Sequence, residues 1–157
     1  MSFSPSQKMS PAFRSALIWV FGLLWVTGCL WLVLHFVFEQ RTDFGVIANP
    51  WEPTAIRVHG LLAVAGVFML GWITSQHVIE ALSQARNRGT GISLAAIGAI
   101  LVLSGYALYY VTGDTLRGNI ALLHEAIGAP AIFIAVLHWR KVGARDPSRR
   151  DIPFRSR

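Results

Sequence analysis

Histidines are the residues of this 157-residue chain whose type and spacing point most directly to chemistry. There are five of them, and each falls within a long apolar stretch: His35, His59, His77, His124 and His138. An ionisable side chain is costly inside a bilayer, so its presence there suggests a functional site by default. A neutral imidazole either ligates a transition metal or hydrogen-bonds to a neighbouring helix, and both uses must be weighed.

The spacing of four of these histidines places them in two rows. His59 and His77 are 18 residues apart, which is five turns at about 3.6 residues per turn. His124 and His138 are 14 residues apart, about 40° short of four turns at roughly 100° per residue. Each pair is therefore expected to project from one face of its helix, with one member towards each end.

The elements that must carry these histidines are four stretches almost free of charge, at about residues 16–38, 55–79, 91–111 and 118–139. Each is long enough for a hydrocarbon core of about 30 Å, which a helix of about 20 residues crosses. The chain is only 14% charged, whereas a soluble domain carries about 25%. Short connections between the later stretches favour antiparallel neighbours. We expect an all-α fold, an integral membrane up-down four-helix bundle, in one domain over residues 1–157.

Positive charge is unevenly distributed along the chain, which has 14 Lys and Arg against 8 Asp and Glu. With the N-terminus inside, eleven basic residues fall on the inner side and three on the outer side. The positive-inside rule then predicts that both ends, including the basic tail at residues 140–157, are cytoplasmic. The net charge of +6 reflects this topology rather than nucleic-acid binding. The inner residues are Lys8, Arg14, Arg86, Arg88, Arg140, Lys141, Arg145, Arg149, Arg150, Arg155 and Arg157; the outer ones are Arg41, Arg57 and Arg117.

This topology pairs the histidines of the second and fourth stretches by depth. Two imidazoles on facing helices can hold a haem iron from both sides, and bundles recurrently build cofactor sites in this way. We therefore expect two non-covalent b-type haems (haem b), the outer one on His59 and His124 and the inner one on His77 and His138. The two rows differ in length, about 27 Å against about 21 Å at 1.5 Å per residue, which unequal helix tilts would absorb.

Two further residues are candidates near the outer haem. Arg57 places a positive charge two residues before His59, on the side where such charges are scarce, and is a candidate contact for a haem propionate. His35 also lies near the outer surface. It either replaces His59 or His124 as a ligand, or binds a quinone, or is an interfacial histidine whose ring reaches the headgroups.

Other chemistries are poorly represented. Cys29 is the only cysteine, and there is no C-x-x-C-H for covalent haem attachment. It ends a sequence like a lipoprotein cleavage box, but the apolar run continues beyond it, which favours an uncleaved helix. No P-loop or dinucleotide fingerprint is present, so we expect no catalytic site in this chain.

Glu125 is a candidate proton relay. Three tyrosines are candidates for a quinone contact, and the alternative is that they form an aromatic belt at the membrane surface: Tyr106, Tyr109 and Tyr110.

The segments Ser104–Tyr110, His124–Gly128 and Leu137–Arg140 carry a resemblance to bacterial four-helix membrane cytochromes of the b type. These include cytochrome b561-like proteins and the cytochrome b subunits of membrane oxidoreductases. The resemblance covers about residues 58–140. It implies a subunit of the bacterial inner (cytoplasmic) membrane that exchanges electrons between a quinone pool and a partner, either a redox subunit or a periplasmic electron-transfer protein.

Two rival functions stay open at this point. A haem-free membrane anchor of a larger complex would use the histidines only for hydrogen bonds between helices. A metal-cation transporter would use histidine and glutamate as ligands, but transporter sites usually lie near the midplane, whereas these histidines are expected at two depths nearer the surfaces.

Overall fold

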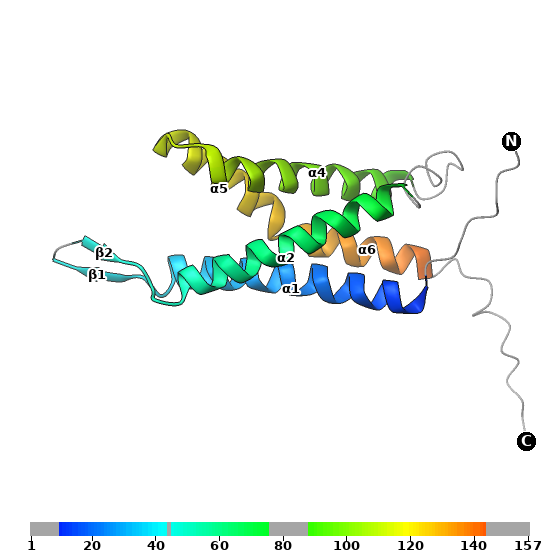
Figure 1. The fold of residues 1–157 in the computed structure, drawn as a ribbon, viewed down its shortest axis with the longest axis horizontal. Coiled ribbons are helices and arrows are strands. Elements are labelled where there is room, and N and C mark those ends of the chain that lie inside the picture. Colours follow the sequence, from blue (N-terminus) through cyan, green and yellow to red (C-terminus); the bar gives the residue numbers. More distant parts are fainter. Residues whose placement is uncertain (1–9, 44, 76–87, 144–157) are drawn as a thin grey trace, which may run out of the picture. The chain divides into compact units, whose positions relative to one another are not determined.

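The computed structural model describes residues 10–43, 45–75 and 88–143 (Figure 1). Its fold is all-α, as predicted, apart from one short β-hairpin. Four helical segments are long and apolar enough to cross a membrane: Pro11–Phe36, Glu52–Ile73, Gly89–Tyr110 and Asp114–Lys141. The chain is therefore a multi-pass membrane protein by the length and composition of its helices. It divides into two compact units, Met1–Gly71 and Trp72–Arg157, and the single membrane domain stays a prediction.

The first unit begins with α1 (Pro11–Phe36), which starts five residues earlier than expected. Ser10 caps it, because the Ser10 hydroxyl accepts the backbone N–H of Phe13 at 3.2 Å, and Pro11 follows at the first helical position. This combination of a hydroxyl cap and an early proline favours helix initiation. The cap explains why the helix begins before the apolar run does.

The connection after α1 contains a β-hairpin that the sequence did not predict. Strand β1 (Gln40–Thr42) pairs antiparallel with β2 (Gly45–Ile47). Gly45 has a φ of +120°, a conformation that favours glycine, and the Thr42 hydroxyl donates to the Gly45 carbonyl at 2.8 Å. Figure 1 shows this hairpin extending beyond the ends of α1 and α2. Strands of three residues are too short for an alternating pattern to be recognised in sequence.

Helix α2 (Glu52–Ile73) begins three residues before the predicted start. The Asn49 side chain accepts the backbone N–H of Trp51 at 3.0 Å, and Glu52 accepts the backbone N–H of Asn49 at 3.0 Å. These two bonds close the turn that leads into the helix. The predicted end of this stretch, at residue 79, lies outside the described residues.

The second unit contains α4 (Arg88–Tyr110), α5 (Asp114–Gly128) and α6 (Ala131–Gly143), and α4 packs against both α5 and α6. The fourth stretch was expected as one helix over residues 118–139, which is wrong in two respects. It begins at Asp114, whose acidic side chain suits a helix N-terminus. It is also interrupted at Ala129–Pro130, where the chain changes direction (Figure 1). Pro130 lacks the N–H that would continue the helical hydrogen bonds.

The described part of the protein buries very few residues: Glu52, Ala55, Gly66 and Ser104. Large apolar side chains such as Leu61, Phe68 and Leu103 are instead exposed on the helix surfaces. In lipid such an arrangement carries no penalty, because the acyl chains are as apolar as the side chains. Two of the four buried residues are polar, Glu52 and Ser104, and both contact histidines.

Candidate functional site

His59 lies on α2 and faces α1. Its Nδ1 atom is 3.2 Å from the Thr27 hydroxyl and 3.1 Å from the Leu24 carbonyl. The next residue on α1 is Gly28, where an added Cβ would lie only 3.1 Å from Cε1 of His59. Glycine at this position allows the imidazole to rest against the backbone of α1, so a hydroxyl and a glycine together form the seat of His59.

The hydrogen bonds around His59 identify which ring nitrogen carries the proton. A carbonyl oxygen only accepts, so the contact with Leu24 requires a hydrogen on Nδ1. The Thr27 hydroxyl is within donating distance of two carbonyls of its own helix, Leu23 at 2.9 Å and Leu24 at 3.0 Å. Its oxygen is therefore an acceptor for His59 as well. A neutral His59 in this setting has its proton on Nδ1 and its basic lone pair on Nε2.

His124, on α5, has the same environment on α4. The Ser104 hydroxyl lies 2.8 Å from Nδ1 of His124 and donates its own hydrogen to the Ile100 carbonyl at 2.7 Å. Ser104 is only 7% exposed. The residue after it is Gly105, where an added Cβ would approach Cε1 of His124 to 3.3 Å. The serine oxygen again acts as acceptor, so Nδ1 is the protonated nitrogen of a neutral His124.

His138, on α6, repeats the arrangement at the other end of α4. The Thr90 hydroxyl is 3.0 Å from Nδ1 of His138, and the next residue is Gly91, whose added Cβ would lie 3.8 Å from the ring. Ser104 and Thr90 are 14 residues apart, as are His124 and His138. The antiparallel register between α4 and the last two helices is therefore the same at both sites, although the Pro130 interruption lies between the histidines.

We call each of these arrangements a hydroxyl–glycine seat: Thr27–Gly28 for His59, Ser104–Gly105 for His124 and Thr90–Gly91 for His138. In all three, the nitrogen that meets the hydroxyl is Nδ1. Metal-ligating histidines commonly donate one ring N–H to an oxygen, which fixes the tautomer and the ring orientation. Hydrogen bonds between helices would also be present in a haem-free anchor. The hydroxyl meets Nδ1 at all three histidines, and this repetition favours an arrangement in which Nε2 of each ring ligates a metal.

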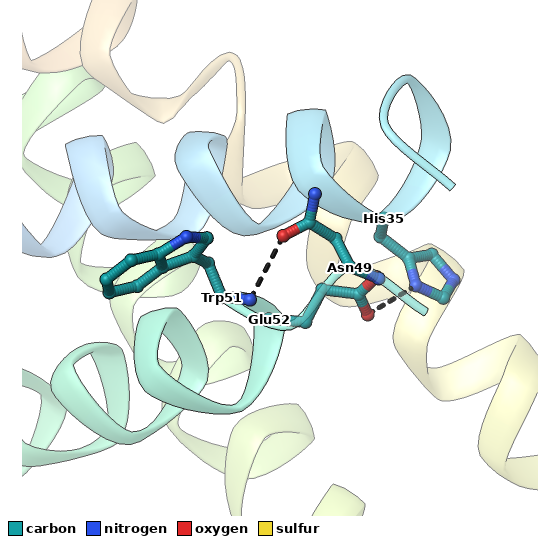
Figure 2. Close-up of polar contacts among 4 residues, drawn as sticks. All are labelled: His35, Asn49, Trp51 and Glu52. Atoms are coloured by element: carbon teal, nitrogen blue, oxygen red, sulfur yellow. Dashed lines mark hydrogen bonds and ion pairs between the residues drawn. The ribbon is translucent and has the colours of Figure 1, made fainter. Parts of the chain in front are cut away.

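The remaining histidines have different outcomes. His77, the predicted partner of His138, lies outside the described residues. His35, on α1, is not on a hydroxyl–glycine seat; its Nδ1 atom is 3.0 Å from Oε2 of Glu52 (Figure 2). His59 and His124 belong to different units, so their predicted pairing stays a prediction.

The other candidate residues named from the sequence lie on α2, α4 and α5. Arg57 is exposed on α2, two residues before His59. Arg117 donates to the Leu108 carbonyl, which ties the start of α5 to the end of α4. Tyr106 and Tyr110 contact each other with ring centroids 4.6 Å apart and are both largely exposed, which suits an aromatic belt. Glu125 is half-buried beside His124.

An apolar groove of about 350 Å³ lies between α1 and α2. The groove runs from Trp51 to Thr27, the residue that seats His59, and is lined by Thr27, Leu30, Leu34, Trp51, Thr54, Ala55 and Val58. The groove is therefore an apolar space next to the His59 seat in the first unit.

Sequence reasoning found the histidines but missed their seats. From the sequence, no contact was predicted between the histidines and Thr27, Thr90 or Ser104, or the glycines that follow them. The signal was available, since a hydroxyl residue followed by glycine occurs at both Thr90 and Ser104 with the same 14-residue interval as the two histidines. Among the described residues, no three His, Cys, Asp or Glu side chains gather to hold a metal ion. That part of the chain gives no support to a metal-cation transporter.

Comparisons with protein-family models, curated proteins and solved structures find no match for this chain. The function must therefore be argued from the seats and their chemistry.

Proposed function

We propose that this protein transfers electrons across a membrane through two non-covalent b-type haems, each held by two histidines. His59 and His124 would ligate one iron, and His77 and His138 the other. The observation that carries the proposal is the hydroxyl–glycine seat, which occurs at each of three histidines, His59, His124 and His138.

The seats prepare the histidines for iron in two ways. At His59 and His124 the oxygen atoms of the seat accept the proton of Nδ1, so Nε2 of a neutral imidazole would be the ligand atom. The glycine lets the ring lie close to the neighbouring helix, so that its position is fixed by backbone rather than by flexible side chains. A ligand held in this way loses little conformational freedom when the haem binds.

The chemistry that a bound haem supplies is one-electron exchange between ferric and ferrous iron. A haem held by two histidines, such as His59 and His124, would supply electron transfer rather than oxygen chemistry. Arg57, which is exposed on α2 two residues before His59, is the candidate contact for a propionate. We assign no catalytic residue.

The partners follow from the same proposal. The excess of basic residues on one side supports an orientation with both ends in the cytoplasm, and the resemblance to bacterial cytochromes of the b type supports a location in the bacterial inner membrane. Electrons would pass between a quinone pool and a redox subunit or periplasmic electron-transfer protein. The β-hairpin and the basic tail are then on opposite sides of the membrane, which gives each partner a separate surface.

The test is to express the full chain with haem supplied, purify it and record a reduced-minus-oxidised spectrum with a pyridine haemochrome assay. The proposal predicts about two haem b per chain, each bound by two histidines. A colourless, folded preparation would contradict it and favour the haem-free anchor. A purified His138→Ala variant separates the two functions further: the haem spectrum must change if the histidine is a ligand and stay the same if it is not.

A further inference from the structure

The pair His35–Glu52 joins α1 to α2 at the end of these helices that leads into β1 and β2 (Figure 2). The two side chains meet at 3.0 Å, between Nδ1 of His35 and Oε2 of Glu52. Only 11% of the Glu52 side chain is exposed, whereas 42% of the His35 side chain is exposed. A buried carboxylate thus stands behind an accessible imidazole.

The other bond of Glu52 determines how His35 is oriented. The backbone N–H of Asn49 donates to Oε1 of Glu52 at 3.0 Å, so Oε2 is the oxygen that faces His35. An ionised carboxylate only accepts hydrogen bonds, so the shared hydrogen is on Nδ1 of His35. The second ring nitrogen faces away from Glu52 (Figure 2). Carboxylate–histidine pairs orient an imidazole in this manner when Nε2 has to accept a proton or hydrogen bond from a ligand.

The surroundings of His35 are aromatic. Trp31 stacks on the imidazole with ring centroids 4.7 Å apart and planes 11° apart, and Phe36 meets it edge-on at 4.8 Å. The apolar groove described above begins at Leu34 and Trp51, the neighbours in sequence of His35 and Glu52. An acceptor nitrogen in such a setting selects a flat, neutral molecule with a hydroxyl donor, rather than a phosphate.

The pair also lies in line with the His59 seat. Glu52 comes seven residues before His59, and His35 comes seven residues after Gly28. Seven residues are about two turns, so both pairs lie in one row, separated by about 10 Å of helix rise. A ligand at His35 would be next along α1 and α2 to the haem proposed at His59.

We propose that His35 and Glu52 bind the headgroup of a membrane-soluble hydroquinone. Nε2 of His35 accepts a hydrogen bond from a ring hydroxyl, Glu52 positions His35, and the groove between α1 and α2 receives the apolar part of the ligand. The choice of ligand rests on the proposed electron-transfer function, but the binding itself does not require a haem.

Two substitutions separate this role from a purely structural one. His35→Asn retains a side-chain N–H near the position of Nδ1, so Glu52 keeps its partner while Nε2 is lost. Glu52→Gln retains an oxygen for the Asn49 N–H and turns its NH₂ towards Nδ1 of His35. Nδ1 must then accept, which moves the imidazole proton to Nε2 and converts that atom from acceptor to donor.

The experiment measures equilibrium binding of decylubiquinol to the fully reduced protein and of decylubiquinone to the fully oxidised protein, in nanodiscs. No electron can pass between protein and ligand in either mixture. We expect the wild type to prefer the quinol, and His35→Asn to weaken quinol binding about tenfold, as for one lost hydrogen bond. In Glu52→Gln the preference should reverse, because a quinone carbonyl accepts the hydrogen of Nε2. A structural pair would show no such reversal.

The absence of a reversal in Glu52→Gln would overturn the inference, and so would four other results. Wild-type protein that binds no quinol is one, and equal affinity in wild type and His35→Asn is another. A loss confined to Tyr109→Phe would place the ligand at the tyrosines instead. Loss of a haem from His35→Asn would make His35 an iron ligand. If the protein contains no haem but Glu52→Gln reverses the preference for quinol over quinone, the quinol site stands and the electron-transfer function fails. If two haems are present and Glu52→Gln causes no reversal, the electron-transfer function stands and the quinol site fails.

Discussion

The two helix hairpins of this protein place histidines against a neighbouring helix in the same way, but they differ in what else they hold. In the second hairpin, α4 packs closely against α5 and α6 and provides two seats in one register. In the first, α1 and α2 are bridged by the His59 and His35 contacts, and an apolar groove lies between them. The second hairpin holds two seated histidines, whereas the first holds one seated histidine together with an apolar groove and the His35–Glu52 pair at its end.

Replacement of a seated histidine should have the largest effect. His124→Ala and His138→Ala should each reduce the haem content from about two to about one per chain, because each iron loses an axial ligand. The pyridine haemochrome assay of the purified variants measures this directly. If either variant kept both haems with an unchanged spectrum, that histidine would not be a ligand and the similarity between the two hairpins would have no functional meaning.

The hydroxyls should come next, and they should differ between the hairpins. Ser104→Ala removes a buried acceptor at 2.8 Å from His124 and should lower haem affinity by about tenfold or more, as is typical for groups that orient a metal ligand. Thr27→Val should cost less, because the Leu24 carbonyl remains an acceptor for His59 at 3.1 Å. Haem transfer to apomyoglobin ranks the affinities. Equal losses, or none, would show that the hydroxyls do not orient the ligands.

The glycines offer a graded test of how closely the rings approach the helices. Gly28→Ala and Gly105→Ala would place a Cβ 3.1 Å and 3.3 Å from an imidazole, so both should displace the ring and broaden or shift the haem absorption bands. Gly91→Ala, at 3.8 Å, should be tolerated. Gly22→Ala is the matched control on α1, where an added Cβ meets nothing within 4 Å in the described structure. A spectrum of Gly22→Ala that changed as much as that of Gly28→Ala would show that close contact with the ring is not the cause.

The sequence predicted the four spans and the shared face of His124 and His138, because both depend on composition and spacing along the chain; the row of His59 and His77 stays a prediction. Prediction from the sequence failed where the outcome depended on contacts between segments. The seats of His124 and His138 depend on the antiparallel register of α4 with α5 and α6, and the sequence signal for them was the 14-residue interval that Thr90 and Ser104 share with the two histidines. The contact between Glu52 and His35 was missed for the same reason, since the two residues are 17 apart in sequence and lie on different helices.

Local features at helix ends were also missed. The early start of α1 depends on a single serine cap and a proline, and the interruption at Pro130 depends on one missing N–H. Neither the serine cap before α1 nor Pro130 interrupts the apolar runs from which the spans were predicted. Proline is tolerated in membrane helices because neighbouring groups compensate for the lost bond. An apolar stretch therefore predicts that the chain crosses the membrane, but not that it does so as one continuous helix.

The smallest expected effect concerns the charge near His59. Arg57→Gln should retain both haems and shift the midpoint potential of one of them downwards, because removal of a nearby positive charge disfavours the reduced, more negative state. Potentiometric titration of the two haems checks this. Arg117→Gln provides a comparison in the second hairpin, where the guanidinium is already bound to the Leu108 carbonyl and a smaller shift is expected. An upward shift for Arg57→Gln would remove Arg57 from the haem site.

The identity of the axial ligands in the purified, oxidised protein decides whether the seated histidines hold iron. Low-temperature electron paramagnetic resonance with near-infrared magnetic circular dichroism distinguishes two imidazoles from every other ligand pair. We expect low-spin ferric iron with two histidines at both haems, and the loss of one such signal in His124→Ala. High-spin iron, a ligand other than histidine, or no iron signal in folded protein would contradict the proposed electron carrier.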